Sequence, residues 1–382
     1  MNKPKKVLIF SHAYFPNWVG GAEIALKEIT DRISENEIEF HLIALGADES
    51  EKKIGNINIH RVKSFGVFTY NKILHKIAKY LFIFQAYFVA KKLHKKNNFD
   101  TIWSLMATYG GFTALFFKRK YRNVKFVLTL QEGDPIEYIL KRLGVFKFIY
   151  KSIFKNADVV QVISNYLGKF AKDMGFKGKP ILIPNAVDLE IFSKEYAKEE
   201  IYIIRENFVS ENQKLLVTTS RLVVKNGLEY VIKALPGIPD YKFLIIGKGE
   251  LEDSLKNLAK DLGVLDRVIF KGYVAQSGIP KYLKASDIFI RPSLSEGLGN
   301  SFLEAMASGI PVIATSVGGI PDFLIDNETG VFCKIKDEES IVESIRKLEN
   351  SDLRNKITQN AFEMVKEKYT WDIISQKIKS LF

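Results

Sequence analysis

The chain has 382 residues, of which 47% are hydrophobic and 26% are charged, and its formal net charge is +12. This length exceeds what one hydrophobic core usually organises, so we expect two domains. The composition excludes a disordered chain. A single cysteine, Cys333, excludes an intrachain disulfide, favours a reducing compartment, and is interpreted as a small core residue of a strand at 330–333.

The positive charge lies in the first half of the chain. Residues 1–190 contain 30 Lys and Arg against 17 Asp and Glu, whereas residues 191–382 contain 26 against 27. Within 61–155 the count is 19 basic residues against 4 acidic residues. The excess of positive charge belongs to one domain, so either an anionic partner or another cause must explain it.

The first half alternates short apolar segments with helical ones. Strands are predicted at 7–10, 39–45, 58–62, 101–105, 124–130, 159–163 and 181–183, and helices at 21–33 and 72–96. Strands separated by helices of this size predict right-handed βαβ units and a parallel sheet. The longest apolar stretch, 80–90, has 11 residues where a spanning helix needs about 20, so a soluble or peripheral cytoplasmic protein is expected.

The second half repeats the pattern. Strands are predicted at 215–219, 242–246, 268–271, 288–291 and 311–314, and an amphipathic helix at 369–382. Turn residues at 184–188 suggest the domain break, giving domains of 1–190 and 191–368. Open parallel sheets bind ligands at the carboxyl ends of their strands, so two such domains are expected to face each other across one cleft.

The strongest local signal is the segment 295–306, which follows a predicted strand and opens a helix at about Asn300. Its glycines allow close backbone approach, and the N–H groups of a helix start suit a diphosphate or a sugar hydroxyl. Glu296 and Glu304 are eight residues apart, so we expect them to contact different parts of one long ligand. An alternative is that Ser301 and Glu304 form only a capping box.

Three further loops follow predicted strands. In 219–227, Arg221 and Lys225 offer two cations for a diphosphate, or two solvated charges at a helix start. The loop 11–23 carries Gly20 and Gly21, which suit a phosphate or sugar approach as well as an ordinary tight turn. The loop 246–251 suits close packing by a planar base. The five histidines are scattered, so no metal site is expected.

Together these residues resemble the family 4 (group 1) retaining glycosyltransferases of GT-B architecture, over nearly the whole chain. The specific match is Glu296-x7-Glu304, preceded by 285–293 and followed by 307–315 and 318–321. The resemblance implies two Rossmann-like domains with parallel sheets, in which the C-terminal helix at 369–382 crosses back to the N-terminal domain. It also implies a nucleotide-diphosphate sugar as donor, a glycan or lipid-linked acceptor, retention of configuration, and no cofactor or metal.

The resemblance also implies residue roles. It assigns the donor sugar to Glu296 and the ribose to Glu304. The sugar and phosphate would meet backbone amides of Leu298, Gly299, Asn300 and Ser301, and the diphosphate would bind Arg221 and Lys225. Gly20 and Gly21 would line the donor and acceptor side, and Gly249 and Leu251 would flank the base. Many relatives carry a histidine after the strand equivalent to 124–130. This chain has Gln131 and Glu132 there, and we hypothesise that one of them makes the sugar contact.

The basic stretch 61–155 includes two aromatic helical segments, 80–84 and 146–150. Basic and aromatic residues on one helix predict peripheral contact with an anionic membrane. A core-packed apolar face with solvated lysines is the alternative. Nucleic-acid binding is not expected, because no reader motif accompanies the charge.

Two other functions fit the same architecture. A sugar-nucleotide epimerase would also bind a nucleotide sugar between two such domains, but the sequence shows no motif for deprotonation. A non-catalytic sugar-nucleotide-binding protein would not need the complete set of Glu296, Glu304, Arg221 and Lys225. The donor sugar, the base and the acceptor are not specified by the sequence.

Overall fold

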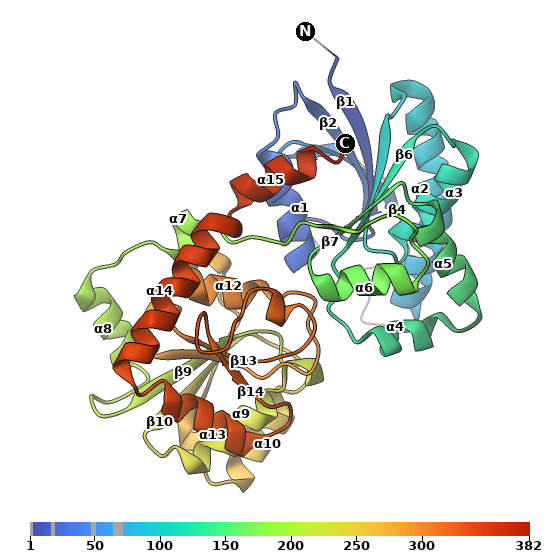
Figure 1. Ribbon diagram of the computed structural model, residues 1–382. Coiled ribbons are helices and arrows are strands. Elements are labelled where there is room, and N and C mark those ends of the chain that lie inside the picture. Colours follow the sequence, from blue (N-terminus) through green and yellow to red (C-terminus); the bar gives the residue numbers. More distant parts are fainter. Residues whose placement is uncertain (1–2, 17–19, 47–50, 64–71) are drawn as a thin grey trace. The chain divides into compact units, whose positions relative to one another are not determined.

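The computed structural model describes residues 3–16, 20–46, 51–63 and 72–382. Contacts divide the chain into two compact units (Figure 1). Unit 1 is Met1–Asn185 with Trp371–Phe382, and unit 2 is Ala186–Thr370. The division falls inside the turn 184–188, a few residues before the boundary expected at 190. Each unit is an α/β domain with its own sheet, as the sequence predicts.

The sheet of unit 1 has the strand order β3-β4-β2-β1-β5-β6-β7-β8. Its strands are β1 (Lys5–Phe10), β2 (Ile38–Gly46), β3 (Glu51–Ile54), β4 (Ile57–Lys63), β5 (Thr101–Leu105), β6 (Lys125–Leu130), β7 (Val159–Val162) and β8 (Ile181–Leu182). Seven of them are parallel, which confirms the predicted sheet. The edge strand β3 was not predicted. It pairs antiparallel with β4 through the tight turn at Gly55, whose φ is +54°.

Helices follow most strands of unit 1. They are α1 (Gly21–Asp31), α2 (Lys72–Asn97), α3 (Gly110–Lys120), α4 (Ile136–Leu143), α5 (Lys147–Asn156), α6 (Asn165–Asp173) and, from the end of the chain, α15 (Trp371–Lys379), with a 3₁₀ turn at Gly144–Phe146. The chain order reverses between β1 and β5, the adjacent strands at the centre of the sheet. This is the position where open parallel sheets bind ligands.

The C-terminal segment is part of the core of unit 1, which confirms that the last helix returns to the N-terminal domain. Trp371, Ile374 and Ile378 of α15 are buried, and α15 packs against α1. The ring of Phe382 lies 5.1 Å from that of Trp103 and 6.0 Å from that of Phe40.

The sheet of unit 2 is wholly parallel, with the order β11-β10-β9-β12-β13-β14. Its strands are β9 (Lys214–Thr219), β10 (Tyr241–Ile246), β11 (Val268–Gly272), β12 (Ile288–Arg291), β13 (Val312–Thr315) and β14 (Val331–Cys333). The chain order therefore reverses between β9 and β12. Both strands lead into loops that the sequence marks as functional.

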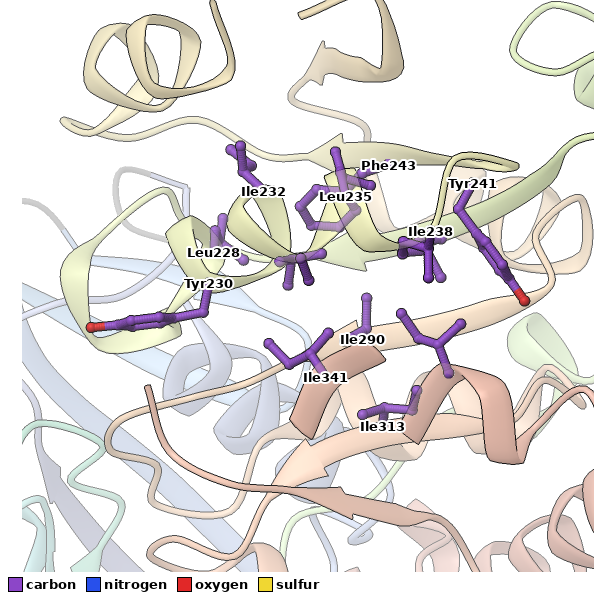
Figure 2. Close-up of a cluster of buried hydrophobic side chains, with 14 of the residues drawn as sticks. Leu228, Tyr230, Ile232, Leu235, Ile238, Tyr241, Phe243, Ile290, Ile313 and Ile341 are labelled. Carbon is purple, nitrogen blue, oxygen red and sulfur yellow. The ribbon is translucent and has the colours of Figure 1, made fainter. Parts of the chain in front are cut away.

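Helices cover both faces of this sheet. They are α7 (Leu189–Phe192), α8 (Lys198–Glu206), α9 (Leu228–Ala234), α10 (Glu252–Asp261), α11 (Ile279–Lys284), α12 (Asn300–Ala307), α13 (Glu338–Lys347) and α14 (Ser351–Lys368), with 3₁₀ turns at Val224–Asn226, Leu235–Gly237, Leu265–Arg267, Gln276–Gly278 and Ile320–Asp322. Figure 2 shows Leu228 and Ile232 of α9 packed over the sheet with Phe243, Ile290 and Ile313 from its strands. This core fixes the strand ends from which the candidate site is built.

We expect Ile374→Ala to lower the free energy of unfolding of unit 1 by about 2–5 kcal/mol, because Ile374 is fully buried and its loss leaves a cavity. All three tryptophans, Trp18, Trp103 and Trp371, belong to unit 1, so urea denaturation followed by tryptophan fluorescence reports this unit alone. The exposed Lys377→Ala on the same helix is the control and should change the free energy by less than about 0.5 kcal/mol. Equal effects of the two changes would contradict the packing described here.

Candidate functional site

The loops that follow β9 and β12 pack against each other at the point where the strand order of unit 2 reverses. The backbone N–H of Leu294 donates to the carbonyl oxygen of Lys225 at 2.7 Å. Gly227 has a φ of +65°, and a Cβ atom there would lie 2.1 Å from the carbonyl oxygen of Pro292. Only glycine permits this approach, so the basic loop and the loop that carries Glu296 form one surface.

Arg291, the last residue of β12, is the buried centre of this surface. Only 6% of the residue is exposed. Its Nη2 lies 2.8 Å from Oε2 of Glu296, and its Nη1 donates to Oγ of Ser301 at 2.7 Å. Its Nε donates to Oγ of Ser293 at 3.2 Å, and the guanidinium stacks 4.2 Å from the centre of the Phe302 ring. A buried cation with these partners fixes the carboxylate it faces.

The sequence did not single out Arg291, which was interpreted only as the end of a strand. The available signal was a charged residue closing the run Ile-Phe-Ile-Arg, in which all four residues are buried. Arginine is almost never buried unless it is paired, so its place in an apolar strand indicates a nearby carboxylate.

Glu296 is held by its backbone as well as by its side chain. Its carbonyl oxygen accepts a hydrogen bond of 3.3 Å from the N–H of Gly319. Gly318 has a φ of +56°, and a Cβ atom there would lie 1.8 Å from the same oxygen. The glycine pair after β13 therefore allows a third loop to close on Glu296.

The helix α12 begins beside this carboxylate. Its N-cap is Gly299, with a φ of +96°, so the capping position has no side chain to accept a hydrogen bond from the first turn. The capping-box alternative is therefore wrong. Ser301 lies inside the helix, and its hydroxyl bonds to Arg291 instead of capping. Leu298 is buried and anchors the approach to the helix, so the amides from Leu298 to Ser301 stand at the positive end of the α12 dipole.

Glu304 lies one turn into α12, away from Glu296. Its Oε1 accepts a hydrogen bond of 3.4 Å from Nε2 of Gln276. Burial raises the pKa of the Glu304 carboxyl to about 7, and Gln276 and the charge of Arg291 offset this only in part. The ionisation of this carboxyl is therefore sensitive to pH near neutrality.

The basic loop places its two cations differently. Arg221 is exposed, whereas Lys225 is half-buried in the short 3₁₀ turn. Nδ2 of Asn226 donates to the carbonyl oxygen of Arg221 at 2.6 Å and fixes the turn between them. The contact between Lys225 and Leu294 brings this loop to the same strand ends as Glu296.

Gly249 and Leu251 also lie at this edge. A Cβ atom on Gly249 would lie 2.3 Å from the carbonyl oxygen of Leu222, and the N–H of Leu251 donates to that oxygen at 3.1 Å. The loop after β10 therefore packs on the basic loop, which explains the need for glycine at 249. At the end of β9, the buried hydroxyls of Thr219 and Ser220 have no hydrogen-bond partner within the described residues. Sequence reasoning did not select these two hydroxyls.

In unit 1, Gly20 and Gly21 begin α1, and residues 17–19 of their loop lie outside the described residues. The N–H of Gly20 donates to Oε2 of Glu23 at 2.9 Å. Burial raises the pKa of the Glu23 carboxyl. This hydrogen bond stabilises the turn at Gly20 without any ligand, which agrees with the alternative of an ordinary tight turn.

Gln131 and Glu132 follow β6, and both contact other loops of unit 1. The side-chain amides of Gln131 and Asn185 pair, with an Nε2–Oδ1 distance of 3.2 Å. Glu132 is 6% exposed, and its Oε1 accepts from the N–H of Ala107 at 3.0 Å. Burial raises the pKa of the Glu132 carboxyl. Of the two, Gln131 is the more accessible candidate for a ligand contact.

The part of the chain that the structure describes contains no group of three or more His, Cys, Asp or Glu side chains placed to hold a metal ion.

Comparison with known proteins covers both units. A family model described as Glycosyltransferase Family 4 matches residues 19–191, and a model described as Glycosyl transferases group 1 matches residues 200–364. The chain belongs to the group 1, family 4 glycosyltransferases. It is therefore an enzyme that transfers a glycosyl group.

Individual proteins agree with this assignment. The glycosyltransferase is 26% identical to N-acetyl-alpha-D-glucosaminyl L-malate synthase of Bacillus anthracis, over 95% of this chain and 94% of the relative. It is 27% identical to a GDP-mannose-dependent alpha-(1-6)-phosphatidylinositol monomannoside mannosyltransferase of Mycobacterium tuberculosis, over 75% and 77% of the two chains. Alr3699/HepE of Anabaena, solved with UDP and glucose, has the same fold, with a TM-score of 0.79 and 19% identity over 99% of both chains.

We expect a double-mutant cycle of Arg291→Met and Glu296→Gln to give a coupling energy of about 1–3 kcal/mol, because each change alone leaves a buried charge without its partner. The cycle is measured by calorimetry on the transition of unit 2, which is the one that tryptophan fluorescence does not follow.

The matched control is the surface pair Lys256 and Glu252, whose Nζ and Oε1 atoms lie 2.6 Å apart with side chains 42% and 34% exposed. Its cycle of Lys256→Met and Glu252→Gln should give less than about 0.5 kcal/mol. A coupling at Arg291 and Glu296 no larger than this would show that the buried pair does not hold the site together.

Proposed function

We propose that this glycosyltransferase moves a sugar from a nucleotide-diphosphate sugar to a glycan or lipid-linked acceptor, with retention of configuration and without a metal ion. It would act from the cytoplasm in the synthesis of cell-envelope polysaccharide or glycolipid. The observation that carries the proposal is the Arg291–Glu296 pair beside the first turn of α12 and the basic loop.

The two carboxylates bind the two ends of the donor. Glu296 accepts hydrogen bonds from the hydroxyls of the transferred sugar, because its ion pair with Arg291 fixes this carboxylate in place. Glu304, one turn further along α12, accepts hydrogen bonds from the ribose. Gly249 and Leu251 flank the base at the end of β10.

The diphosphate lies between these two ends. The amides from Leu298 to Ser301 point toward it with the positive end of the α12 dipole. Arg221 and Lys225 neutralise the charge that grows on the leaving phosphate as the glycosidic bond breaks. Two fixed cations and a helix dipole thus supply the charge that a metal ion supplies in other transferases.

The transfer step needs no protein nucleophile. The bond from the anomeric carbon to the phosphate oxygen breaks, and the acceptor hydroxyl attacks from the same face. Its proton passes to the departing phosphate oxygen. Glu296 is a poor nucleophile because its carboxylate is paired with a buried guanidinium.

The similar proteins support a nucleotide-sugar donor, but they do not indicate which acceptor this chain uses. The mannosyltransferase of Mycobacterium tuberculosis is named for GDP-mannose and phosphatidylinositol monomannoside, the Bacillus anthracis enzyme is named for L-malate, and Alr3699/HepE was solved with UDP and glucose. Because these acceptors differ, the preference for a lipid-linked or glycan acceptor rests on the basic charge of residues 61–155.

We expect a screen of nucleotide sugars by thermal shift to identify a donor that also gives transfer to a lipid-linked or glycan acceptor. Glu296→Ala and Arg221→Met should each lower the transfer rate at least about 100-fold, because the first removes the hydrogen bonds that position the transferred sugar and the second removes a cation from the leaving phosphate. Transfer should persist in EDTA, and NMR of the product should show the anomeric configuration of the donor.

The control variant is Lys242→Met, a half-buried lysine of β10 outside the site, which should keep the wild-type rate. Loss of transfer in EDTA, or an inverted product, would contradict the proposed mechanism. Conversion of the donor to an epimer without any acceptor would contradict the proposed reaction.

We expect donor affinity to rise about ten-fold as the pH increases from one unit below to one unit above 7. Ionised Glu304 accepts hydrogen bonds from both ribose hydroxyls, and its pKa of about 7 means that the ionised fraction rises through this interval. Calorimetric titration should use an intact nucleotide sugar, since its diphosphate is esterified at both ends and loses no proton in this range.

Glu304→Gln should bind the donor more weakly and with an affinity that does not change over the same interval. An unchanged pH dependence in this variant would show that another group is responsible and that Glu304 does not bind the ribose through its carboxylate.

A further inference from the structure

The helix α2 of unit 1 is apolar on two opposite faces. Its inner face packs on the unit, where Ala78, Phe82, Ala86 and Ala90 are fully buried. Its outer face carries Ile77, Leu81, Phe84 and Phe88, which are 48%, 49%, 59% and 65% exposed. A helix that only covers a sheet has a polar outer face, so the second apolar face requires another explanation.

The four exposed residues form a continuous stripe, which we name the outer stripe. They are spaced four, seven and eleven residues from Ile77, so all of them lie on one side of the helix. Single exposed apolar residues are normal on a protein surface, whereas a contiguous row of large ones marks an interaction site.

Positive charge borders the outer stripe. Nζ of Lys91 lies 5.5 Å and 6.0 Å from the ring centres of Tyr87 and Phe88, and Lys92 and Lys95 are exposed within the next two turns. The whole helix contains seven lysines and no aspartate or glutamate. Its surface therefore combines apolar contact with attraction for anions.

Aromatic and basic side chains also link α2 to α4, which precedes α5. The ring of Tyr80 lies 5.7 Å from that of Tyr109, and Nη2 of Arg142 on α4 donates to the Tyr109 hydroxyl at 3.5 Å. Phe146 and Phe148, at the start of α5, are 57% and 69% exposed. Figure 1 shows α2, α3 and α5 side by side on unit 1 with α4 near their ends.

We propose that the outer stripe, with Phe146 and Phe148, docks unit 1 on an anionic lipid surface. Helix α2 would lie in the interfacial plane, with its phenylalanines among the acyl chains and its lysines at the headgroups. No helix in the described part of the chain is long and apolar enough to cross a membrane. The outer stripe shares no residue with the candidate donor site, so this proposal does not depend on the proposed function.

Charge favours a lipid surface over a second copy of this chain as the occupant. Two copies that met through α2 would bring together fourteen lysines without one acidic residue from either helix. An anionic bilayer gains attraction from the same charges. Residues 64–71, which belong to the stretch 61–155 for which the sequence predicts membrane contact, lie outside the described residues.

The test is co-sedimentation of the full chain with vesicles of phosphatidylcholine containing phosphatidylglycerol, at low salt, and with vesicles of phosphatidylcholine alone. We expect binding to the anionic vesicles, and at least about ten-fold weaker partitioning for the double variant Phe84→Ser and Phe88→Ser. The triple variant Lys91→Gln, Lys92→Gln and Lys95→Gln should lose a similar factor and much of the salt dependence.

Matched controls come from exposed residues of unit 2. Tyr273→Ser and Ile325→Ser replace side chains that are 74% and 57% exposed, and Lys260→Gln, Lys347→Gln and Lys368→Gln remove the same charge. These variants should bind vesicles as the wild type does. Because all the changed side chains are at the surface, thermal unfolding should be the same for each pair of test and control.

Three results would overturn the proposal. One is the absence of binding to anionic vesicles, and another is an equal loss of binding in the control variants. The third is a dimer in sedimentation equilibrium that dissociates in the Phe84→Ser, Phe88→Ser variant, since this would make a second copy the occupant of the outer stripe.

Discussion

The candidate site depends on one buried ion pair, Arg291 with Glu296. Removing a guanidinium from water costs free energy that a single carboxylate does not fully restore. Here two serine hydroxyls and the face of Phe302 supply further contacts, so each of the three guanidinium nitrogens has an acceptor. The consequence is a carboxylate held in position before any ligand arrives, which is the condition for electrostatic preorganisation.

The glycines around Glu296 are required because neighbouring loops pack closely against the loop that carries it. The loops after β9 and β13 approach the Glu296 loop so closely that Gly227 and Gly318 have no room for a Cβ atom. Gly299 turns the chain into α12 with a left-handed φ and leaves the first turn of the helix without a side-chain cap among the described residues. The same residues that pack the strand ends therefore also expose amides and cations at one edge of the sheet. In unit 1 the charge has a different distribution, spread over α2 and α5 around exposed aromatic rings.

Much of the fold could be predicted from the sequence because apolar runs of strand length alternate with helical segments. The exception is β3, whose four residues Glu-Lys-Lys-Ile contain one apolar side chain and so carry no strand signal. The sequence also predicts Glu296 and Glu304 as site residues, because the segment that carries them follows a predicted strand and begins a helix. The arginine that closes an apolar strand indicates a carboxylate nearby, but the sequence could not show which one, since Glu296 and Ser301 meet Arg291 only in the folded chain. The burial of Glu132 could not be predicted from the sequence either. Glu132 looks like an exposed loop residue until the loop after β5 covers it.

A crystal structure of the enzyme with an intact nucleotide sugar would test the role of the Arg291–Glu296 pair most directly. We expect sugar hydroxyls on the Glu296 carboxylate with the Arg291 contact preserved, the ribose on Glu304, and the diphosphate between the start of α12 and Arg221. A donor bound with its sugar away from Glu296, or an Arg291 side chain released to bind the diphosphate itself, would contradict that role.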